Sequence, residues 1–305
     1  MPLRLFAKRP DFDFMGKRWM GFTVSLLLTA LSLGMIFSKG LNLGIDFTGG
    51  ILMEIHTEQP ADLGKLRSTL SGQGFGEVSL QNIGGDKDVM IRIQVSENDD
   101  QAIMIEKVKT LLAENISESI DFRKIDYVGP TIGRELVENG ISAVLISFIA
   151  IMVYVWFRFE WQYGFGAIVA LVHDTIMVLG FFAVTRFDFG LAAVAAILTI
   201  VGYSINDSVV IYDRVRENMR RFKKKPVSDI LNLSVNETMS RTILTAGSTL
   251  AAGLALGIFG GSVIEGFAWA IVFGVTVGTY SSVFIAAPTL IYLNIRGSEA
   301  QEATA

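Results

Sequence analysis

The sequence contains no cysteine and only two histidines, His56 and His173. The absence of cysteine excludes a disulfide framework, a thiolate zinc site and a cysteine nucleophile, and two histidines exclude a histidine-rich metal site. The sequence also lacks a P-loop motif (G-x-x-x-x-G-K-S/T), a zinc-protease motif (H-E-x-x-H) and a hydrolase elbow (G-x-S-x-G). We therefore expect no enzymatic activity, no metal and no cofactor. Any work that the protein does should draw on a gradient rather than on bound nucleotide.

Charge is also scarce, since Asp, Glu, Lys and Arg make up only 18% of the 305 residues while apolar residues make up 51%. Together with the 30 glycines, the apolar share reaches roughly 61%, against about 45–50% in soluble domains. A chain of this size cannot hide so many apolar side chains in a water-soluble core. The net charge of −4 argues against a nucleic-acid partner. The composition predicts an integral membrane protein.

Six apolar runs are long enough to cross a membrane, which takes about 20 residues. The first follows Lys17 and Arg18, but it is longer than the core of a signal peptide and no A-x-A-like cleavage site follows it, so we expect a retained anchor. The last run is long enough to tilt, or to bend near Pro288. The predicted membrane helices are 19–37, 134–159, 163–185, 189–212, 241–260 and 265–293.

Basic residues predict the orientation, because cytoplasmic segments are enriched in Lys and Arg. The tail 1–18 carries five basic residues and the segment 213–240 carries seven, whereas the short loops on the opposite side have only Arg186. We therefore expect the tails 1–18 and 294–305 to be cytoplasmic and 38–133 to be external. The segment 213–240 is expected to be an amphipathic helix on the inner leaflet or a solvated loop. Its basic side chains would meet anionic lipid or a cytoplasmic partner.

The segment 38–133 can fold in water, and from Lys39 to Gly133 it holds 9 Lys/Arg against 15 Asp/Glu. A turn is expected at 84–86 and a helix cap at Asn98. The apolar spacing predicts strands at 51–56, 78–83, 89–95 and 120–128, and helices at 61–73 and 99–114. The order β-α-β-β-α-β predicts an α+β ferredoxin-like domain between the first two of six membrane helices. That fold does not by itself indicate a function.

Ionisable side chains inside the predicted spans are the most informative residues, because each costs about 3 kcal/mol or more near the bilayer centre. Span three contains His173 and Asp174 near the midplane, span four contains Asp207, and span five begins with Arg241 at the start of a polar stripe. The hypothesis is a proton path in which Asp207 titrates and Arg241 is its counter-charge. Its expected lining residues are Asp207, Arg241, Asp174, His173, Asn206, Ser204 and Thr245.

The alternative is that Asp207 and Arg241 form a structural ion pair while the hydroxyl groups hold the helices together. For His173 and Asp174 both interpretations stay open, since a neutral histidine bonded to a neighbouring helix would have the same sequence pattern. His56 lies in a predicted external strand and is expected to be an ordinary surface residue.

Glycines form a second pattern on span five, where Gly253, Gly257 and Gly261 are spaced by four residues. Two consecutive G-x-x-x-G steps allow another helix to approach closely. We expect this face to pack within the bundle, and an interface with a partner is the alternative.

Three segments resemble the signatures of the SecF family of bacterial protein export. They are Gly44-Ile-Asp-Phe-Thr-Gly-Gly50, Val128-Gly-Pro-Thr-Ile-Gly-Arg-Glu-Leu136 and the run 203–218 in span four. The likeness covers nearly the whole chain, and it includes the turn 259–266 before the last span. The family is grouped with the resistance-nodulation-division (RND) transporters, whose half-unit has six spans and a large external loop. The motif residues outside the spans are Gly44, Asp46, Gly49, Gly50, Gly129, Pro130 and Gly133.

The resemblance implies an accessory subunit of the Sec translocase in the bacterial cytoplasmic (inner) membrane. The implied partners are SecD in a heteromer, the SecYEG channel, YajC and SecA transiently, unfolded preprotein and membrane lipid. The family is thought to use the proton-motive force to complete export after the SecA-driven step, and its proton-path aspartate and arginine fall on Asp207 and Arg241. His173 and Asp174 also match the family. The glycine motifs would act as hinges or tight turns where the external domain joins the spans.

Two other functions stay open at this point. One is a half-unit of an RND-type exporter of small amphiphiles or lipids, although the external domain has only about 95 residues and this sequence contains no duplicated second half. The other is a passive scaffold, in which Asp207 and Arg241 are a structural pair.

Overall fold

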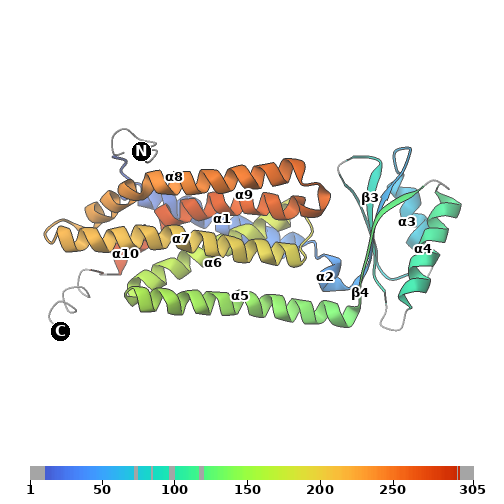
Figure 1. Cartoon of the computed structure of the whole chain (residues 1–305), viewed down its shortest axis with the longest axis horizontal. Helices are drawn as coiled ribbons and strands as arrows, with labels where there is room; N and C mark the ends of the chain where they lie inside the picture. Colours follow the sequence, from blue (N-terminus) through green and yellow to red (C-terminus); the bar gives the residue numbers. More distant parts are fainter. Residues whose placement is uncertain are drawn as a thin grey trace. The chain divides into compact units, whose positions relative to one another are not determined.

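The structure is a computed structural model, and it describes residues 11–71, 75–83, 85–95, 100–116, 120–293 and 295. The chain divides into two compact units, which Figure 1 shows in the colours of the sequence. The helical unit comprises Met1–Asn42, Ala143–Phe187 and Ala192–Ala305. The sheet unit comprises Leu43–Ser142 and Asp188–Leu191, so it includes the short connection that leads into a later membrane helix.

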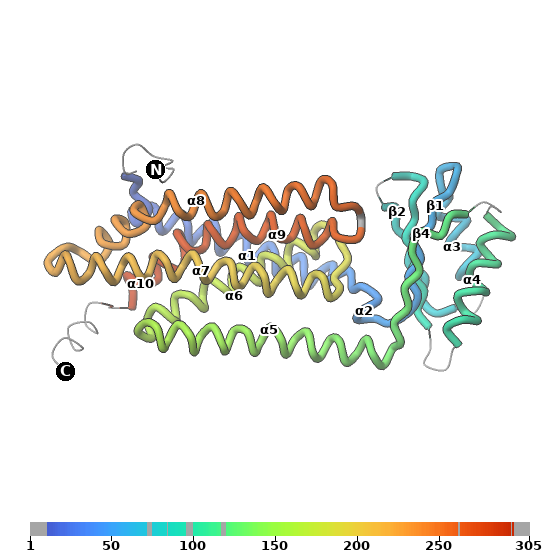
Figure 2. Tube along the Cα trace, in the orientation of Figure 1, coloured from blue at the N-terminus to red at the C-terminus, as the bar shows by residue number. Residues whose placement is uncertain are grey.

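The sheet unit contains an antiparallel sheet in the order β2-β3-β1-β4, with α3 and α4 on one face (Figure 2). Along the chain its elements are α2 (Ile45–Thr48), β1 (Gly50–His56), α3 (Leu63–Ser71), β2 (Val78–Asn82), β3 (Asp88–Ile93), α4 (Gln101–Asn115) and β4 (Asp121–Val128). This order and this sheet confirm the predicted ferredoxin-like domain.

The core of the sheet unit lies between the sheet and its two helices. Alternate residues of the central strands face it, because successive side chains of a strand point to opposite faces. The fully buried side chains are Ile51, Met53 and Ile55 of β1, Val89, Ile91 and Ile93 of β3, Leu66 and Leu70 of α3, and Val108 and Leu112 of α4. Asn98, the expected cap, lies outside the described residues, as does Gly84 of the expected turn. Helix α4 is capped by Asp100, whose Oδ1 accepts hydrogen bonds from the N–H groups of Ala102 and Ile103.

The helical unit is an all-α bundle. Its helices are α1 (Arg18–Lys39), the second half of α5 (Pro130–Arg158), α6 (Trp161–Thr185), α7 (Leu191–Arg221), α8 (Val227–Phe259), α9 (Ser262–Ser281), the π-helical turn η1 (Ser282–Ala286) and α10 (Ala287–Tyr292). Within the described residues, six helices are long and apolar enough to cross a membrane, so the predicted six-span membrane protein is confirmed. Pro288 lies in the first turn of α10, directly after the π-helical turn. A proline cannot donate an N–H bond, and the wider turn accommodates this defect within one continuous span.

The structure differs from the sequence prediction over 213–240, where a surface helix or a loop was expected. Helix α7 continues to Arg221 and α8 begins at Val227, so only 222–226 is a turn. The reason is a local apolar core between the polar ends of the two helices. It is formed by Val215, Met219, Ile230, Leu231 and Val235, all buried.

Candidate functional site

Asp207 of α7 lies buried against α8, with an exposed fraction of 6%. The hydroxyl of Thr242 donates a hydrogen bond to Asp207 Oδ1 at 2.6 Å. The other carboxylate oxygen, Oδ2, is also buried, and it has no hydrogen-bond partner within the described part of the chain. A buried carboxylate with one oxygen left over is costly to keep charged. Asp207 is therefore held on one side and unsatisfied on the other.

Arg241 acts on Asp207 electrostatically but does not contact it directly. Its side chain is exposed on the helical unit, and among the described residues it forms no ion pair with Asp207 within 4 Å. The geometry of a helix gives the reason, because neighbouring residues point about 100° apart. Thr242 faces α7, so Arg241 turns outward, and in the same way Asn206 is exposed beside the buried Asp207. The Thr245 hydroxyl donates to the carbonyls of its own helix, at Arg241 and Thr242.

Asp174 of α6 lies at the centre of a second polar cluster and is fully buried. Its Oδ2 accepts hydrogen bonds from Ser204 Oγ of α7 at 2.6 Å and from Ser281 Oγ of α9 at 2.8 Å. Its Oδ1 lies 3.0 Å from Nδ1 of His173. Asp174 thus joins three membrane helices, and both of its oxygens are satisfied.

His173 is the fourth member of the Asp174 cluster. A bond from Nδ1 to the Asp174 carboxylate requires the proton on Nδ1, which leaves Nε2 as an acceptor when the ring is neutral. Nε2 is buried and has no partner among the residues that the structure describes. Both oxygens of the Asp174 carboxylate are therefore hydrogen-bonded, whereas Nε2 of His173 has no bond to a described residue.

A third hydrogen-bonded pair lies between α7 and the π-helical turn. Ser208 Oγ and Ser282 Oγ are 3.0 Å apart, and Ser282 also donates to the carbonyl of Gly278. Glycine at 278 allows this approach, since a Cβ there would lie 3.1 Å from the Cβ of Ser204. The predicted lining residues did not include Ser208, Ser281, Ser282 or Thr242. The signal that could have found the serines is a polar pair shortly before Pro288 in an apolar span.

The glycine motifs of the sheet unit are close-packed turns. Gly49 and Gly50 have φ of +70° and +121°, a region that favours glycine. A Cβ on Gly49 would lie 2.9 Å from the Cα of Pro130, and a Cβ on Gly133 would lie 3.1 Å from the Gly49 nitrogen. Pro130 is the first residue of α5, directly after Gly129. The two motifs therefore lie against each other where β1 and α5 begin.

Asp46 of the first motif caps α7. Its Oδ2 accepts a hydrogen bond from the Leu191 N–H at 2.8 Å. The positive end of the helix dipole also stabilises a carboxylate at this position. Glycine at position 190 leaves room for the Asp46 carboxylate, since a Cβ there would collide with Oδ2. Gly44 holds the same connection through a backbone bond from its N–H to the Phe189 carbonyl, at 3.0 Å.

Arg92 of β3 forms an ion pair with Asp188 of the connection that leads into α7. The Arg92 side chain is 12% exposed, and burial lowers the pKa of its guanidinium from the ordinary value. Removing a guanidinium from water is costly unless a carboxylate compensates for it. Asp46, Gly44 and Arg92 thus fix residues 188–191 to the sheet unit.

The glycine stripe of span five packs against α9. A Cβ on Gly253 would lie 2.8 Å from Val272, and one on Gly257 would lie 3.1 Å from the Trp269 ring. Gly261 does not continue this face, because it lies beyond the end of α8 with φ of +77° in the turn before α9.

Comparison with protein families gives two matches. The model of the protein export membrane protein SecD/SecF, C-terminal, matches residues 107–296, and the model of the SecD/SecF GG motif matches residues 34–61. The chain is 50% identical over 289 residues to the protein translocase subunit SecF of Rickettsia bellii (strain OSU 85-389), covering 95% of both chains. It is 50% identical to the SecF of Rickettsia rickettsii (strain Sheila Smith), covering 95% of this chain and 94% of the relative.

Solved structures agree with the family match. The chain resembles the crystal structure of SecDF, a translocon-associated membrane protein, from Thermus thermophilus, with a TM-score of 0.85 and 36% identity. It resembles SecDF in its super-membrane-facing form with a TM-score of 0.70 and 34% identity. The matches cover 95% and 99% of this chain but only 39% and 41% of those SecDF chains. The chain belongs to the SecD/SecF family of protein export membrane proteins and matches its SecF members over nearly their whole length.

Proposed function

We propose that the chain is an accessory subunit of the Sec preprotein translocase, and that with SecD it uses the proton-motive force to drive or complete export after the SecA-driven step. The observation that carries this proposal is Asp207, a buried carboxylate in a membrane helix with one hydrogen-bonded and one unsatisfied oxygen. A charge at such a position is costly, and protonation removes that cost. Gain or loss of a proton therefore strongly changes the free energy of this helix arrangement. The proposed location is the bacterial inner membrane, with both termini and the basic end of the bundle in the cytoplasm.

The energy available to such a step is sufficient for a conformational change. One charge that crosses 100 mV is worth about 2.3 kcal/mol, which shifts a two-state equilibrium by more than tenfold. In the proposed mechanism, protonation removes the charge of Asp207 and α7 repacks against α8. The end of α7 is held by Asp46, Gly44 and, through Asp188, Arg92, so movement of α7 would be transmitted to the sheet unit that handles the emerging preprotein.

The exposed polar residues next to Asp207 support the pairing with SecD. Arg241 and Asn206 are exposed on membrane helices, and an arginine that faces lipid is expensive. A second membrane protein over this face would bury both residues and bring a partner to Arg241. The SecDF structures that the chain resembles are more than twice its length, which is consistent with a missing neighbour. SecYEG, SecA and YajC are proposed as transient neighbours of the assembly.

The test is Asp207→Asn in cells that depend on this chain, with preprotein export followed by pulse-chase and assembly with SecD checked by co-purification. The amide keeps the shape of the side chain but cannot titrate, so we expect export to slow on the order of tenfold or more while assembly is retained. Asp207→Glu keeps a titratable group and should retain part of the activity. The matched control is Asp213→Asn, which alters an exposed carboxylate of the same helix, and export should stay within about twofold of wild type. Normal export by an assembled Asp207→Asn protein would refute proton coupling at this residue.

A further inference from the structure

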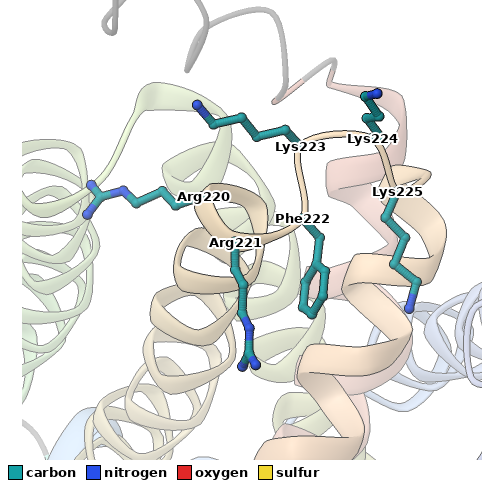
Figure 3. A pocket seen from close by; sticks show the side chains of 6 residues that line it. All are labelled: Arg220, Arg221, Phe222, Lys223, Lys224 and Lys225. Carbon is teal, nitrogen blue, oxygen red and sulfur yellow. The ribbon is translucent and has the colours of Figure 1, made fainter.

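The turn between α7 and α8 has an unusual concentration of positive charge. Of the six residues Arg220–Lys225, which we call the basic tip, five are basic, and Figure 3 shows their side chains spread around the turn. They line a surface depression of about 670 Å³. The turn is ordered by backbone bonds, from the Phe222 N–H to the Asn218 carbonyl at 2.8 Å and from the Lys225 N–H to the Phe222 carbonyl at 3.2 Å.

The helices beneath the basic tip form a folded hairpin. Asn218 is buried, and its Nδ2 donates to Ser234 Oγ at 3.0 Å and to Glu237 Oε2 at 2.8 Å, which joins α7 to α8. Met219 and Ile230 pack in the buried core between the same helices. The basic tip therefore has a defined shape, so little conformational entropy would be lost when it binds a partner.

Exposed aromatic residues mark the level of the membrane surface in this part of the bundle. Trp156 and Trp161, at the junction of α5 and α6, are 64% and 57% exposed, and tryptophan concentrates at the membrane–water interface. Arg158, between them, forms a 2.7 Å ion pair with Asp213, which places this position of α7 at the same level. Arg221 lies about 12 Å farther along the helix. This rise exceeds the Debye length of about 8 Å at physiological salt, so we expect lipid phosphates to attract the basic tip less than they attract Arg158.

Four charges of the basic tip are exposed to a partner. Among the described residues, no carboxylate lies within 4 Å of Arg220, Arg221, Lys223 or Lys224. The ring of Phe222 is half-buried, and it turns back between the helices, with Arg221 5.2 Å and Lys225 5.7 Å from its centroid (Figure 3). It therefore offers no free face on which a nucleic-acid base could stack.

We infer that the basic tip is a docking site for an acidic surface of another protein. The inference rests on the orientation given under the proposed function, in which this end of the bundle lies in the cytoplasm, and it is independent of proton coupling at Asp207. Opposite charges would steer the partner to the hairpin and set its register.

A zero-length carbodiimide tests this directly, because it joins a lysine amine to a carboxylate only where the two groups are in contact. The full chain is treated in native membranes, and coupled peptides are assigned by mass spectrometry. We expect carboxylate adducts at Lys223, Lys224 and Lys225 on the order of tenfold above those at Lys17, an exposed lysine near the same end of the bundle.

Two matched double variants distinguish the effect of positive charge from the effect of replacing the lysine side chains. Lys223→Arg with Lys224→Arg keeps the charge, so the adduct at Lys225 should persist. Lys223→Gln with Lys224→Gln removes two charges, and the same adduct should fall on the order of tenfold. Neither pair touches the core of the hairpin. Equal Lys225 yields in the two variants, or yields no higher than at Lys17, would overturn the inference.

Two further outcomes would assign the basic tip to another class of partner. In nanodiscs that contain only this chain and lipid, phosphatidylglycerol should leave the rate at which Lys223 and Lys224 are acylated unchanged. A several-fold slower rate would show that lipid covers the basic tip. Loss of the carbodiimide adducts after nuclease digestion would indicate nucleic acid. A normal adduct pattern in the Asp207→Asn protein would keep the docking inference separate from the fate of the proposed function.

Discussion

Within its described residues, the bundle contains two buried carboxylates on neighbouring helices, and their surroundings differ. Asp174 receives hydrogen bonds on both oxygens, from Ser204 and Ser281, and lies 3.0 Å from His173. Asp207 receives a hydrogen bond from Thr242 on one oxygen, and its other oxygen has no partner among the described residues. Both positions are expensive for a charge inside a membrane, but only the first is fully compensated. The difference is the basis for proposing Asp207, rather than Asp174, as the residue that changes its protonation state.

The two clusters also differ in what a neighbouring protein could reach. Asp174 is enclosed by α6, α7 and α9, all of the same unit. Asp207 lies one residue from the exposed Asn206, and its bonding partner Thr242 lies one residue from the exposed Arg241. A partner subunit on that face would change the surroundings of Asp207 far more than those of Asp174. The proposed proton step is therefore placed at Asp207, and Asp174 is proposed as a structural anchor beside it.

The largest effect on stability is expected from Asp174→Ala. The change leaves the hydroxyl of Ser204 and the imidazole of His173 without their acceptor in a buried site, and Ser281 keeps only its bond to the Gly278 carbonyl. Each hydrogen bond to a charged group is worth about 1.5–3 kcal/mol. We expect a loss of several kcal/mol, seen as a lower midpoint of thermal unfolding of the detergent-purified chain. Asp207→Ala is the matched comparison and should cost less than half as much. Equal losses for the two variants would remove the distinction between the carboxylates.

A smaller effect is expected from Thr242→Val, which keeps the volume of the side chain but removes the single hydrogen bond to Asp207. The expected loss of stability is about 1–3 kcal/mol, and export should slow less than in Asp207→Asn because the titratable group remains. Thr242→Ser restores the hydroxyl and should return both quantities close to wild type. Export that is unchanged in Thr242→Val would mean that the bond has no part in the proposed proton step.

The sequence predicts the existence of these clusters better than their geometry. Asp174, Asp207 and Ser204 are recognisable because polar groups in an apolar span must have a reason to be buried. The outward direction of Arg241 is different, since it depends on how α8 is rotated against α7, and a stripe spaced by three and four residues does not fix that rotation within one residue. Ser281 and Ser282 are harder still, because serines are common in spans and a pair of them does not by itself show which helices they face. Their role follows from the π-helical turn before Pro288.

In the sheet unit, too, the helices and strands could be predicted from the sequence, whereas the contacts between distant residues could not. Its β-α-β-β-α-β order follows from alternation and helical spacing, which are local properties of the chain. The cap that Asp46 provides for α7 is a contact between residues far apart in sequence, and no local pattern announces it. The Arg92–Asp188 pair is of the same kind. The glycine motifs were predicted to be hinges or tight turns, and the positive φ values of Gly49 and Gly50 fit tight turns.

The smallest effect is expected from Ser208→Ala, which removes the bond to Ser282 on the residue directly after Asp207. Hydrogen bonds between membrane helices are worth about 0.6 kcal/mol on average, because the unfolded chain in the membrane finds other partners. We therefore expect a shift in the unfolding midpoint near the limit of measurement and normal export. Ser282→Ala also removes the bond to the Gly278 carbonyl, so it should cost slightly more. The double variant should cost no more than Ser282→Ala alone, since the Ser208–Ser282 bond is already lost there. A defect in export as large as that of Thr242→Val would show that the polar path extends from α8 through α7 to the π-helical turn, and would place Asp174 and Asp207 in one connected network instead of two.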